Sequence, residues 1–202
     1  MPPPSHDVTL AVLAGGRGSR MGLPKSRLTL GGRPILAYLL ERLAWPGPTL
    51  LVSSPGNERP PGHELFGAEA TDPQADQGPL RGVLTALERA SAGTDVVVIV
   101  TVDMPAMERG CLEWMIDRLG PGMTAVMCSR SVEGVERVEP FPCVMRASGK
   151  QMITRRLGAG LRSVHGLCEE TGVKVFPAPA DWPARVWANL NYPDDLAAFE
   201  RT

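Results

Sequence analysis

The sequence lacks the features that mark nucleic-acid-binding and membrane proteins. Its 21 Lys and Arg residues are balanced by 22 Asp and Glu residues, so the net charge is −1 and provides no general basic surface. The longest wholly apolar runs, such as Val96–Val100, are far too short to cross a membrane. Residues 1–7, MPPPSHD, have no apolar core of a signal peptide and are expected to form a flexible N-terminal end. We therefore expect neither a nucleic-acid partner nor a membrane association.

Metal-binding and redox motifs are also missing. The four cysteines are well separated and form no C-x-x-C pair, and the three histidines show no H-E-x-x-H spacing. Isolated cysteines of this kind are usually small buried hydrophobic residues, and the histidines are expected in surface or packing roles. A reduced, cytoplasmic protein fits this pattern. The residues concerned are Cys111, Cys128, Cys143, Cys168, His6, His63 and His165.

What is present is an alternation of strand and helix patterns. The stretch 95–103, DVVVIVTVD, is apolar without alternation, which predicts a strand buried on both faces, as in a central parallel strand. Leu36, Leu39, Leu40 and Leu43 have the spacing of one apolar helix face, with Pro34 in its first turn. Further strands are expected at 8–13, 49–53, 123–128, 141–145 and 173–176, and further helices at 80–87, 112–119 and 163–171 and from Pro193 onward.

This order predicts the fold class. Strands that alternate with helices form a mainly parallel sheet with helices on both faces, a three-layer α/β/α, Rossmann-like architecture. The polar loops are too short to separate domains, and 202 residues suit a single one. We expect that domain to span residues 8–202.

The loop after the first strand carries the main functional signal. Residues 13–26 read LAGGRGSRMGLPKS, with three glycines within four residues, two arginines and a lysine. Glycines let backbone N–H groups approach an anion closely, and the cations offset its charge. The loop is therefore expected to bind a phosphate.

Two common phosphate-binding patterns do not fit this loop. The P-loop pattern G-x-x-x-x-G-K-[ST] needs a glycine where Pro24 stands, and proline has no N–H to donate. The dinucleotide pattern G-x-G-x-x-G needs a third glycine where Met21 stands. It also needs an acidic residue after the second strand, where Ser53 and Ser54 stand instead.

The stretch LAGGRGSRMGLPKSRLTLGGRPIL, residues 13–36, resembles the signature of MobA-like nucleotidyltransferases. The resemblance extends over most of the chain. Asp72 with Gly78-Pro79-Leu80-Arg81-Gly82, Asp103-Met104-Pro105, and the segment 189–196, NLNYPDDL, are similar to motifs of the same family. The resemblance implies a fold of the nucleotide-diphospho-sugar transferase type. It further implies transfer of GMP from GTP to molybdopterin with release of pyrophosphate, a requirement for Mg²⁺, and transient contact with other proteins of molybdenum cofactor biosynthesis.

The proposed chemistry brings two anions together, so the site must neutralise charge and align the reactants. Arg20 and Lys25 are the expected cations on the triphosphate. Asp103 follows the apolar strand DVVVIVTV, residues 95–102, and should lie at the carboxyl edge of the sheet, where a carboxylate suits Mg²⁺. These three residues are the expected catalytic residues, and Asp103 is the expected metal ligand.

The other site residues are expected from the family motifs. The full set expected to bind the nucleotide is Leu13, Ala14, Gly15, Gly16, Gly18, Lys25, Ser53, Asp72, Gly78 and Asp103. Asp72 either reads the base or forms an Asx turn before Pro73. Asn189 and Asn191 are expected at the acceptor or the metal, with a helix cap as the alternative for Asn191.

Several alternatives remain open at this point. The Ala14-Gly15-Gly16 run is typical of guanylyl transfer, but Ser53 and Arg81 depart from the residues that guanylyl-transferring members commonly carry. A CTP-dependent transferase, or one with another phosphorylated acceptor, is therefore an alternative. From other classes, the near-complete dinucleotide pattern keeps an NAD- or FAD-binding oxidoreductase open, and a non-catalytic nucleotide-binding protein is a further alternative.

Overall fold

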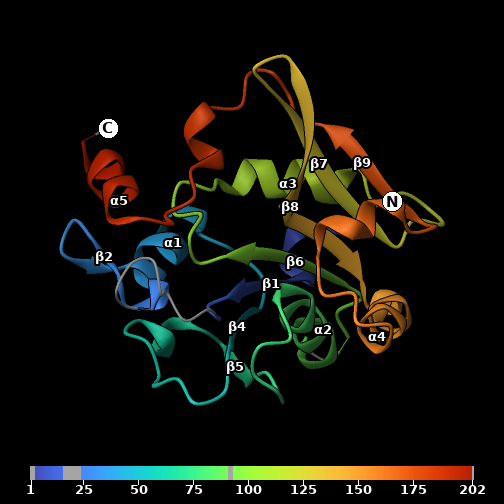
Figure 1. Ribbon diagram of the computed structural model, residues 1–202, viewed down its shortest axis with the longest axis horizontal. Helices are drawn as coiled ribbons and strands as arrows, with labels where there is room; N and C mark the ends of the chain where they lie inside the picture. Colours follow the sequence, from blue (N-terminus) through green and yellow to red (C-terminus); the bar gives the residue numbers. More distant parts are fainter. Residues whose placement is uncertain (1–2, 16–23, 91–92, 202) are drawn as a thin grey trace.

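The computed structural model describes residues 3–15, 24–90 and 93–201, which form one seven-stranded sheet with helices on both faces and a small two-stranded hairpin (Figure 1). The order in the sheet is β5-β4-β1-β6-β8-β7-β9, and the hairpin pairs β2 with β3. The strands are β1 (Val8–Leu13), β2 (Thr29–Leu30), β3 (Arg33–Pro34), β4 (Thr49–Ser53), β5 (Ala68–Thr71), β6 (Val96–Thr101), β7 (Ala125–Val132), β8 (Val135–Arg146) and β9 (Val173–Pro177).

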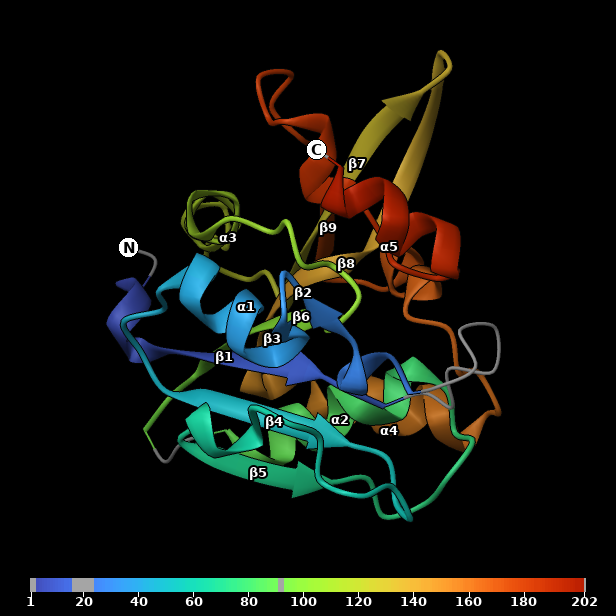
Figure 2. The same ribbon diagram turned by 90° about the vertical axis from the view of Figure 1, so that its left-hand side faces the viewer.

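The helices form the outer two layers. Helices α1 and α3 lie on one face of the sheet, and α2 and α4 lie together on the other (Figures 1 and 2). The α-helices are α1 (Ile35–Leu43), α2 (Pro79–Arg89), α3 (Arg109–Asp117), α4 (Lys150–Gly158) and α5 (Pro193–Glu200). Short 3₁₀ helices are η1 (Ser5–Asp7), η2 (Lys25–Arg27), η3 (His63–Leu65), η4 (Ala147–Gly149), η5 (His165–Glu169) and η6 (Ala184–Trp187). Among the described residues, no helix has the length and apolar character needed to span a membrane.

The centre of the sheet is parallel and buried on both faces. β1 lies between β4 and β6 and is parallel to both, and every residue of β1 is buried. β6 is buried along its length except at Thr101, in agreement with its continuous apolar sequence. β8 is antiparallel to both β6 and β7, so the sheet is mainly rather than wholly parallel. The predicted three-layer, mainly parallel α/β architecture is confirmed.

The parallel strands end together at one edge of the sheet. Leu13, the last residue of β1, lies opposite Val52 in β4 and Thr101 in β6, and Ser53 lies opposite Thr71, the last residue of β5. The loops that follow these strands therefore share this carboxyl edge (Figure 2). Open α/β sheets bind their ligands at this edge.

The elements that were not predicted from the sequence include α4 and β5, besides the small hairpin of β2 and β3. α4 buries Arg156 beside Met152 and Ile153, and an arginine on the inner face obscures the apolar pattern of a helix. β5 is a four-residue strand, AEAT, at the edge of the sheet, with three of its residues exposed. A strand of this kind has neither the β-branched run nor the alternation that marks a strand in sequence.

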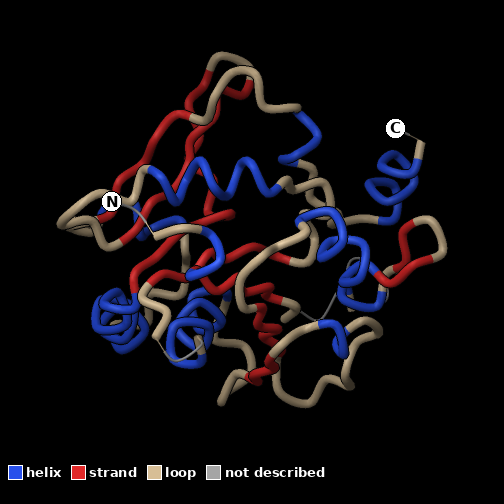
Figure 3. Tube along the Cα trace, turned by 180° about the vertical axis from the view of Figure 1, so that it is seen from behind, coloured by secondary structure: helices blue, strands red, loops and turns tan. Residues whose placement is uncertain are grey.

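Other boundaries differ from the predictions in smaller ways. The helix expected at 163–171 is the shorter 3₁₀ helix η5, and Pro34 precedes α1 as its N-cap instead of lying in the first turn. β7 and β8 are longer than predicted, because they extend beyond the core as a polar hairpin that protrudes from the body of the protein (Figure 3). The turn of this hairpin is Glu133-Gly134, and both residues have positive φ.

The buried centre of β6 gives a stability prediction. Ile99 is 0% exposed between β1 and β8. We expect Ile99→Ala to lower the free energy of unfolding by about 2–5 kcal/mol, because it removes buried methyl groups and leaves a cavity. Ile99→Val, which removes one methylene group, should lower it by about 1 kcal/mol. Urea unfolding followed by circular dichroism measures both, and equal effects of the two substitutions would contradict the close packing of this strand.

Candidate active site

A cavity of about 530 Å³ lies along the carboxyl edge of the sheet. Its lining residues follow the order of the strands: Asp72 after β5, Ser54 after β4, Gly15 after β1 and Asp103 after β6. Beyond β6 the wall continues with residues 139–141 of β8. Because neighbouring strands lie about 4.8 Å apart, the cavity spans roughly 19 Å from β5 to β8.

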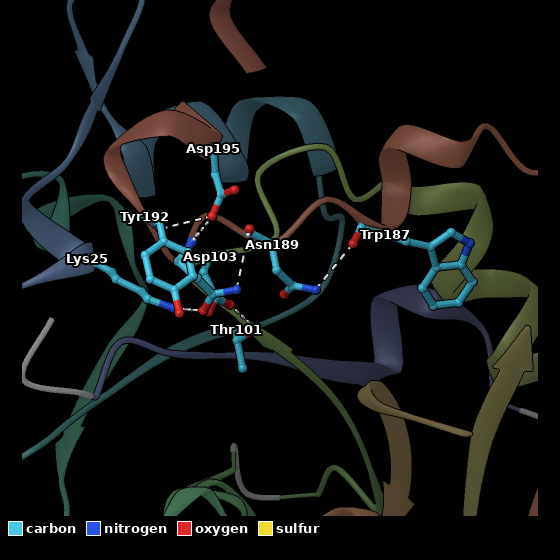
Figure 4. A network of polar contacts seen from close by, with 8 residues as sticks. Lys25, Thr101, Asp103, Trp187, Asn189, Tyr192 and Asp195 are labelled. Carbon is cyan, nitrogen blue, oxygen red and sulfur yellow. Dashed lines mark hydrogen bonds and ion pairs between the residues drawn. The ribbon is translucent and has the colours of Figure 1, made fainter. Parts of the chain in front are cut away.

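A lysine and an aspartate distant in sequence meet within this cavity. Nζ of Lys25 donates to Oδ2 of Asp103 at 2.6 Å and to Oδ1 of Asn191 at 2.7 Å (Figure 4). The side chains of Lys25 and Asp103 are only 23% and 18% exposed, so water screens this ion pair less than it would on the open surface. The structure thus brings together three of the residues expected at the reaction centre.

The backbone around Asp103 fixes the position of its carboxylate. Asp103 comes directly after β6 and Val102, and Oγ1 of Thr101 donates to its Oδ1 at 2.5 Å. Its backbone carbonyl accepts the N–H of Leu190 at 2.9 Å, which holds the segment with Asn189 and Asn191 beside the strand. The N-cap of α3 is Glu108, so capping that helix is not the role of Asp103.

The segment before α5 presents Asn191 to the lysine. Oδ2 of Asp195 accepts the backbone N–H groups of Asn191 and Tyr192, both at 2.8 Å, and Tyr192 is the N-cap of α5. Asn191 is therefore not the helix cap, and its side-chain oxygen is directed to Lys25. Asn189 lines the cavity, and its Nδ2 donates to the carbonyl of Trp187 at 3.2 Å.

Asp72 places a second carboxylate in the cavity, near the β5 end. Its Oδ1 is buried and has no hydrogen-bond partner among the described residues, so this oxygen accepts no Asx-turn hydrogen bond. Burial raises the pKa of Asp72, and the nearby hydroxyl of Thr85 and the charge of Arg81 only partly offset this effect. A buried carboxylate oxygen without a donor needs one from a ligand or from water.

Glycine leaves room at one position of the cavity wall and supplies a positive φ at another. A Cβ atom at Gly15 would lie 2.7 Å from Oγ of Ser54, closer than non-bonded atoms approach without one of them moving. Gly78 has a φ of +73° as the N-cap of α2, and a Cβ there would lie 3.1 Å from Cβ of Arg162. Both glycines line the cavity, as does Leu13.

Not every expected nucleotide-binding residue reaches the cavity. Ser53 is turned toward β5, with its Oγ 3.4 Å from the carbonyl of Ala70, and Ser54 lines the cavity in its place. Ala14 is 4% exposed, does not line the cavity and donates its N–H to the carbonyl of Val52. Gly16, Gly18 and Arg20 lie outside the described residues.

Parts of the lining were not identified from the sequence, among them Pro55 and Asn57 after β4. The loop of residues 74–77 continues the wall from Asp72 to Gly78, and its polar composition does not distinguish it from other loops. Residues 139–141 enter the wall from β8. The signal that marks them is a pair of prolines, Pro140 and Pro142, within a strand, because proline cannot complete a central ladder.

The cluster around Asp103 suits a divalent cation that takes some of its ligands from the protein and the others from a substrate. The oxygens of Asp103 and Asn191 face one cation, the ammonium group of Lys25, so they already form a cation site. No group of three or more His, Cys, Asp or Glu residues is gathered in the described part of the chain. A single carboxylate suits Mg²⁺, which usually completes its shell with water and substrate phosphates.

The cysteines and histidines are remote from this chemistry. Cys111, Cys128 and Cys143 are buried and free, and burial raises the pKa of Cys111 to about 11 and the pKa values of Cys128 and Cys143 to about 12. Thiols with such pKa values are not nucleophiles at neutral pH. The prediction of small buried hydrophobic residues is confirmed for these three, whereas Cys168 is only half-buried.

Comparison with known proteins agrees with this geometry. A family model described as a MobA-like NTP transferase domain matches residues 10–175. A molybdenum cofactor guanylyltransferase of Cereibacter sphaeroides is 35% identical over 191 residues, which cover 94% of this chain and 93% of the relative. A probable molybdenum cofactor guanylyltransferase of Deinococcus radiodurans is 29% identical, with 94% and 92% of the two chains covered.

Solved structures share the fold. Molybdopterin-guanine dinucleotide biosynthesis protein A from Archaeoglobus fulgidus superposes with a TM-score of 0.75 at 22% identity and covers 96% of this chain and 97% of its own. A 2-C-methyl-D-erythritol 4-phosphate cytidylyltransferase from Thermus thermophilus gives a TM-score of 0.69 at 20% identity, with the same coverage of both chains. At such identities the similarity shows the nucleotide-diphospho-sugar transferase type of fold.

The raised pKa of Asp72 predicts a pH-dependent stability. Between the ordinary carboxyl pKa and the raised native value, the native state binds more protons than the unfolded chain, so the free energy of unfolding falls as pH rises. We expect Asp72→Asn to have a higher free energy of unfolding than the wild type at pH 7. This gain should disappear below about pH 4, where the carboxyl group is protonated in both states.

Urea unfolding of the nucleotide-free protein between pH 4 and pH 8 measures this difference. Asp117→Asn, on the exposed end of α3, removes the same charge outside the cavity and serves as the control. A loss of stability in Asp72→Asn that is equal at every pH would contradict the assignment of an unsatisfied carboxylate.

The contact between Lys25 and Asp103 predicts competition between the lysine and a metal ion. Lys25→Met removes the ammonium group from Oδ2 of Asp103, so we expect Mg²⁺ alone to bind at least about fivefold more tightly than to the wild type. Isothermal titration calorimetry with MgCl₂ measures this affinity without turnover. Arg27→Met, in the same 3₁₀ helix but paired with Glu58, should leave the affinity unchanged. Unchanged or weaker binding by Lys25→Met would show that Asp103 does not hold the ion.

Proposed function

The chain belongs to the MobA-like NTP transferase family and is a nucleotidyltransferase, and we propose that it transfers GMP from GTP to molybdopterin in molybdenum cofactor biosynthesis. The observation that carries the proposal is the meeting of Lys25 and Asp103 in a cavity at the carboxyl edge of the sheet. A phosphoryl-transfer site needs a cation for the phosphates and a carboxylate for the metal, and this pair supplies both. We expect this activity to reside in one domain, residues 8–202, in the cytoplasm.

The reaction is a displacement at the α-phosphate of GTP. An oxygen of the acceptor's phosphate forms a bond to the α-phosphorus, the bond from that phosphorus to the bridging oxygen breaks, and pyrophosphate leaves. Both reactants are anions, so the protein accelerates the step by holding them in line and offsetting their charge. The acceptor phosphate is itself the nucleophile, which leaves no step for a nucleophilic side chain.

Lys25 is the residue we assign to the triphosphate, and Asp103 is the residue we assign to Mg²⁺. When bound, Mg²⁺ offsets negative charge on the α-phosphate and on the departing pyrophosphate. Lys25 must then leave Asp103 for a phosphate oxygen. The ammonium group of Lys25 would pair with the phosphate, and the carboxylate of Asp103 would pair with Mg²⁺. Arg20 and the glycines at positions 16 and 18 are proposed to complete the phosphate site.

The choice of guanine is supported by Asp72. Guanine has an N–H group and an amino group side by side on its base-pairing edge, whereas cytosine has one amino group beside an acceptor nitrogen. Asp72 lines the cavity, and a carboxylate can accept both of these groups of guanine. We therefore propose that Asp72 reads the base, with Gly15, Leu13 and Gly78 shaping the wall around it.

A CTP-dependent transferase is the second candidate, because Ser53 and Arg81 depart from the residues that guanylyl-transferring members commonly carry. The Oγ of Ser53 lies 3.4 Å from the carbonyl of Ala70, and Arg81 bonds to Thr85 and Glu88. Gly15 stands where cytidylyl-transferring members typically carry alanine, and this resemblance supports guanine. Family membership provides no support for the oxidoreductase and accessory-protein alternatives.

The decisive test is nucleotide-dependent release of pyrophosphate. Purified protein is mixed with Mg²⁺, molybdopterin and GTP, CTP, ATP or UTP in turn. GTP should give the fastest release, and the product should be molybdopterin linked to GMP by mass spectrometry. We expect Asp103→Asn to lower kcat at least about 100-fold, because it removes the charge that holds the metal.

Two controls make the outcome specific. Asp117→Asn removes an exposed carboxylate on α3 and should retain wild-type kcat. Omission of molybdopterin should abolish pyrophosphate release. Faster release with CTP would replace the proposal by the second candidate, and wild-type kcat in Asp103→Asn would contradict the assignment of this residue.

A further inference from the structure

The wall of the cavity beyond Asp103 is made by an irregular part of β8. β6 and β8 pair only as far as Ile99 opposite Cys143. Toward β7, Met127 pairs with Cys143 but the next residue, Cys128, pairs with Glu139, so residues 140–142 bulge out of the ladder. Pro140 and Pro142 have no N–H to donate, which accounts for the break in pairing. As a result Glu139, Pro140 and Phe141 line the cavity.

Glu139 is held in a fixed position. Its Oε1 accepts Nε–H of Arg130 across the hairpin at 2.5 Å, and the Glu139 side chain is only 16% exposed. The guanidinium of Arg130 lies 5.4 Å from the ring centroid of Trp187, which in turn packs at 5.6 Å on Trp182. Trp182 contacts Trp114 of α3 edge to face at 5.2 Å. This row of rings connects the base of the hairpin to α3, so the carboxylate is preorganised rather than mobile.

The second oxygen of this carboxylate is available to a ligand. Within residues 3–15, 24–90 and 93–201, no donor contacts Oε2 of Glu139. An ion pair with Arg130 does not by itself require the Glu139 carboxylate to lie in the wall of the cavity. A largely desolvated carboxylate with one free oxygen recognises N–H groups and disfavours carbonyl oxygens.

The position of Glu139 assigns it to the acceptor and not to the nucleotide. Asp72, which we assign to the base, follows β5, and Glu139 lies on β8, four strands further along the sheet. Lys25 and Asp103, after β1 and β6, separate the two ends. A nucleotide whose base lies at Asp72 and whose phosphates lie at Lys25 leaves the β8 end to the second substrate.

We propose that Glu139, positioned by Arg130, recognises the amino and ring N–H groups of the acceptor's pterin ring, with Pro140 and Phe141 as the apolar surface beside that ring. This assignment rests on the proposed function, because it takes the acceptor to be a pterin. A pterin carries an amino group at C2 next to a ring N–H, which together match a carboxylate. A lumazine, with a carbonyl oxygen in place of that amino group, offers one donor fewer and sets an oxygen against the carboxylate.

The test compares two fluorescent probes, 6-hydroxymethylpterin and 6-hydroxymethyllumazine, which differ by the amino group or carbonyl oxygen at C2 and by the N–H that the carbonyl brings to N1. Neither carries a phosphate, so binding is measured by fluorescence titration without turnover, both with and without GTP and Mg²⁺. The wild type should bind the pterin at least about tenfold more tightly than the lumazine, the usual effect of a hydrogen bond to a charged group. Glu139→Gln should bring the two affinities within about threefold of each other, because an amide tolerates either partner.

Matched variants separate recognition from folding. Glu136→Gln removes a carboxylate from an exposed position of the same strand and should retain the preference for the pterin. Glu139→Asp keeps the charge and should retain the preference with weaker binding. GTP affinity should be unchanged in all three. A wild type that does not distinguish the probes, or a Glu139→Gln variant that keeps the full preference, would overturn the proposal.

The same experiment separates this proposal from the proposed function. If the wild type prefers the pterin through Glu139 but releases no pyrophosphate with molybdopterin and any nucleotide, the transfer reaction is wrong and the acceptor site stands. If GMP is transferred but Glu139→Gln changes neither the probe preference nor KM for molybdopterin, the function stands and the role of Glu139 is wrong.

Discussion

The ion pair between Lys25 and Asp103 is the contact on which the site depends. The two residues are 78 positions apart, and the parallel arrangement of β1 and β6 brings them to one edge of the sheet. Each charge is the other's main partner in the resting protein, which avoids an uncompensated charge in a largely desolvated cavity. The same pair can exchange partners when a triphosphate and a cation arrive. The opposite charges that hold Lys25 and Asp103 together in the resting protein are therefore the same charges that we propose to bind the triphosphate and the cation.

The cavity has a carboxylate near each end and this ion pair between them. Asp72 lacks a donor on one oxygen at the β5 end, and Glu139 is fixed by Arg130 at the β8 end. Under the proposed function both carboxylates would accept N–H groups, which guanine and a pterin share on their amino-oxo edges. The order of strands in the sheet would then keep the two substrates apart.

The sequence predicts the elements whose hydrophobic pattern matches the burial of their residues in the folded protein. β1 and β4 were predicted at their observed bounds, and Asp103 was placed correctly because a buried apolar strand must end at the sheet edge. α4 was missed because Arg156 lies on its buried face. The place of Glu139 in the cavity wall could not be predicted, because it depends on a bulge in pairing between distant strands. Ser54 lines the cavity and Ser53 does not, because a shift of one residue changes the face on which a strand side chain lies.

The exchange of partners at Lys25 and Asp103 can be seen directly in a crystal structure with Mg²⁺ and a GTP analogue that has a methylene group between the α- and β-phosphorus atoms. We expect Nζ of Lys25 to leave Asp103 for a phosphate oxygen, Mg²⁺ to bind to the freed carboxylate, and the guanine edge to donate to Asp72. A nucleotide bound away from this edge of the sheet, or a Lys25 that stays on Asp103 with the triphosphate in place, would contradict this exchange.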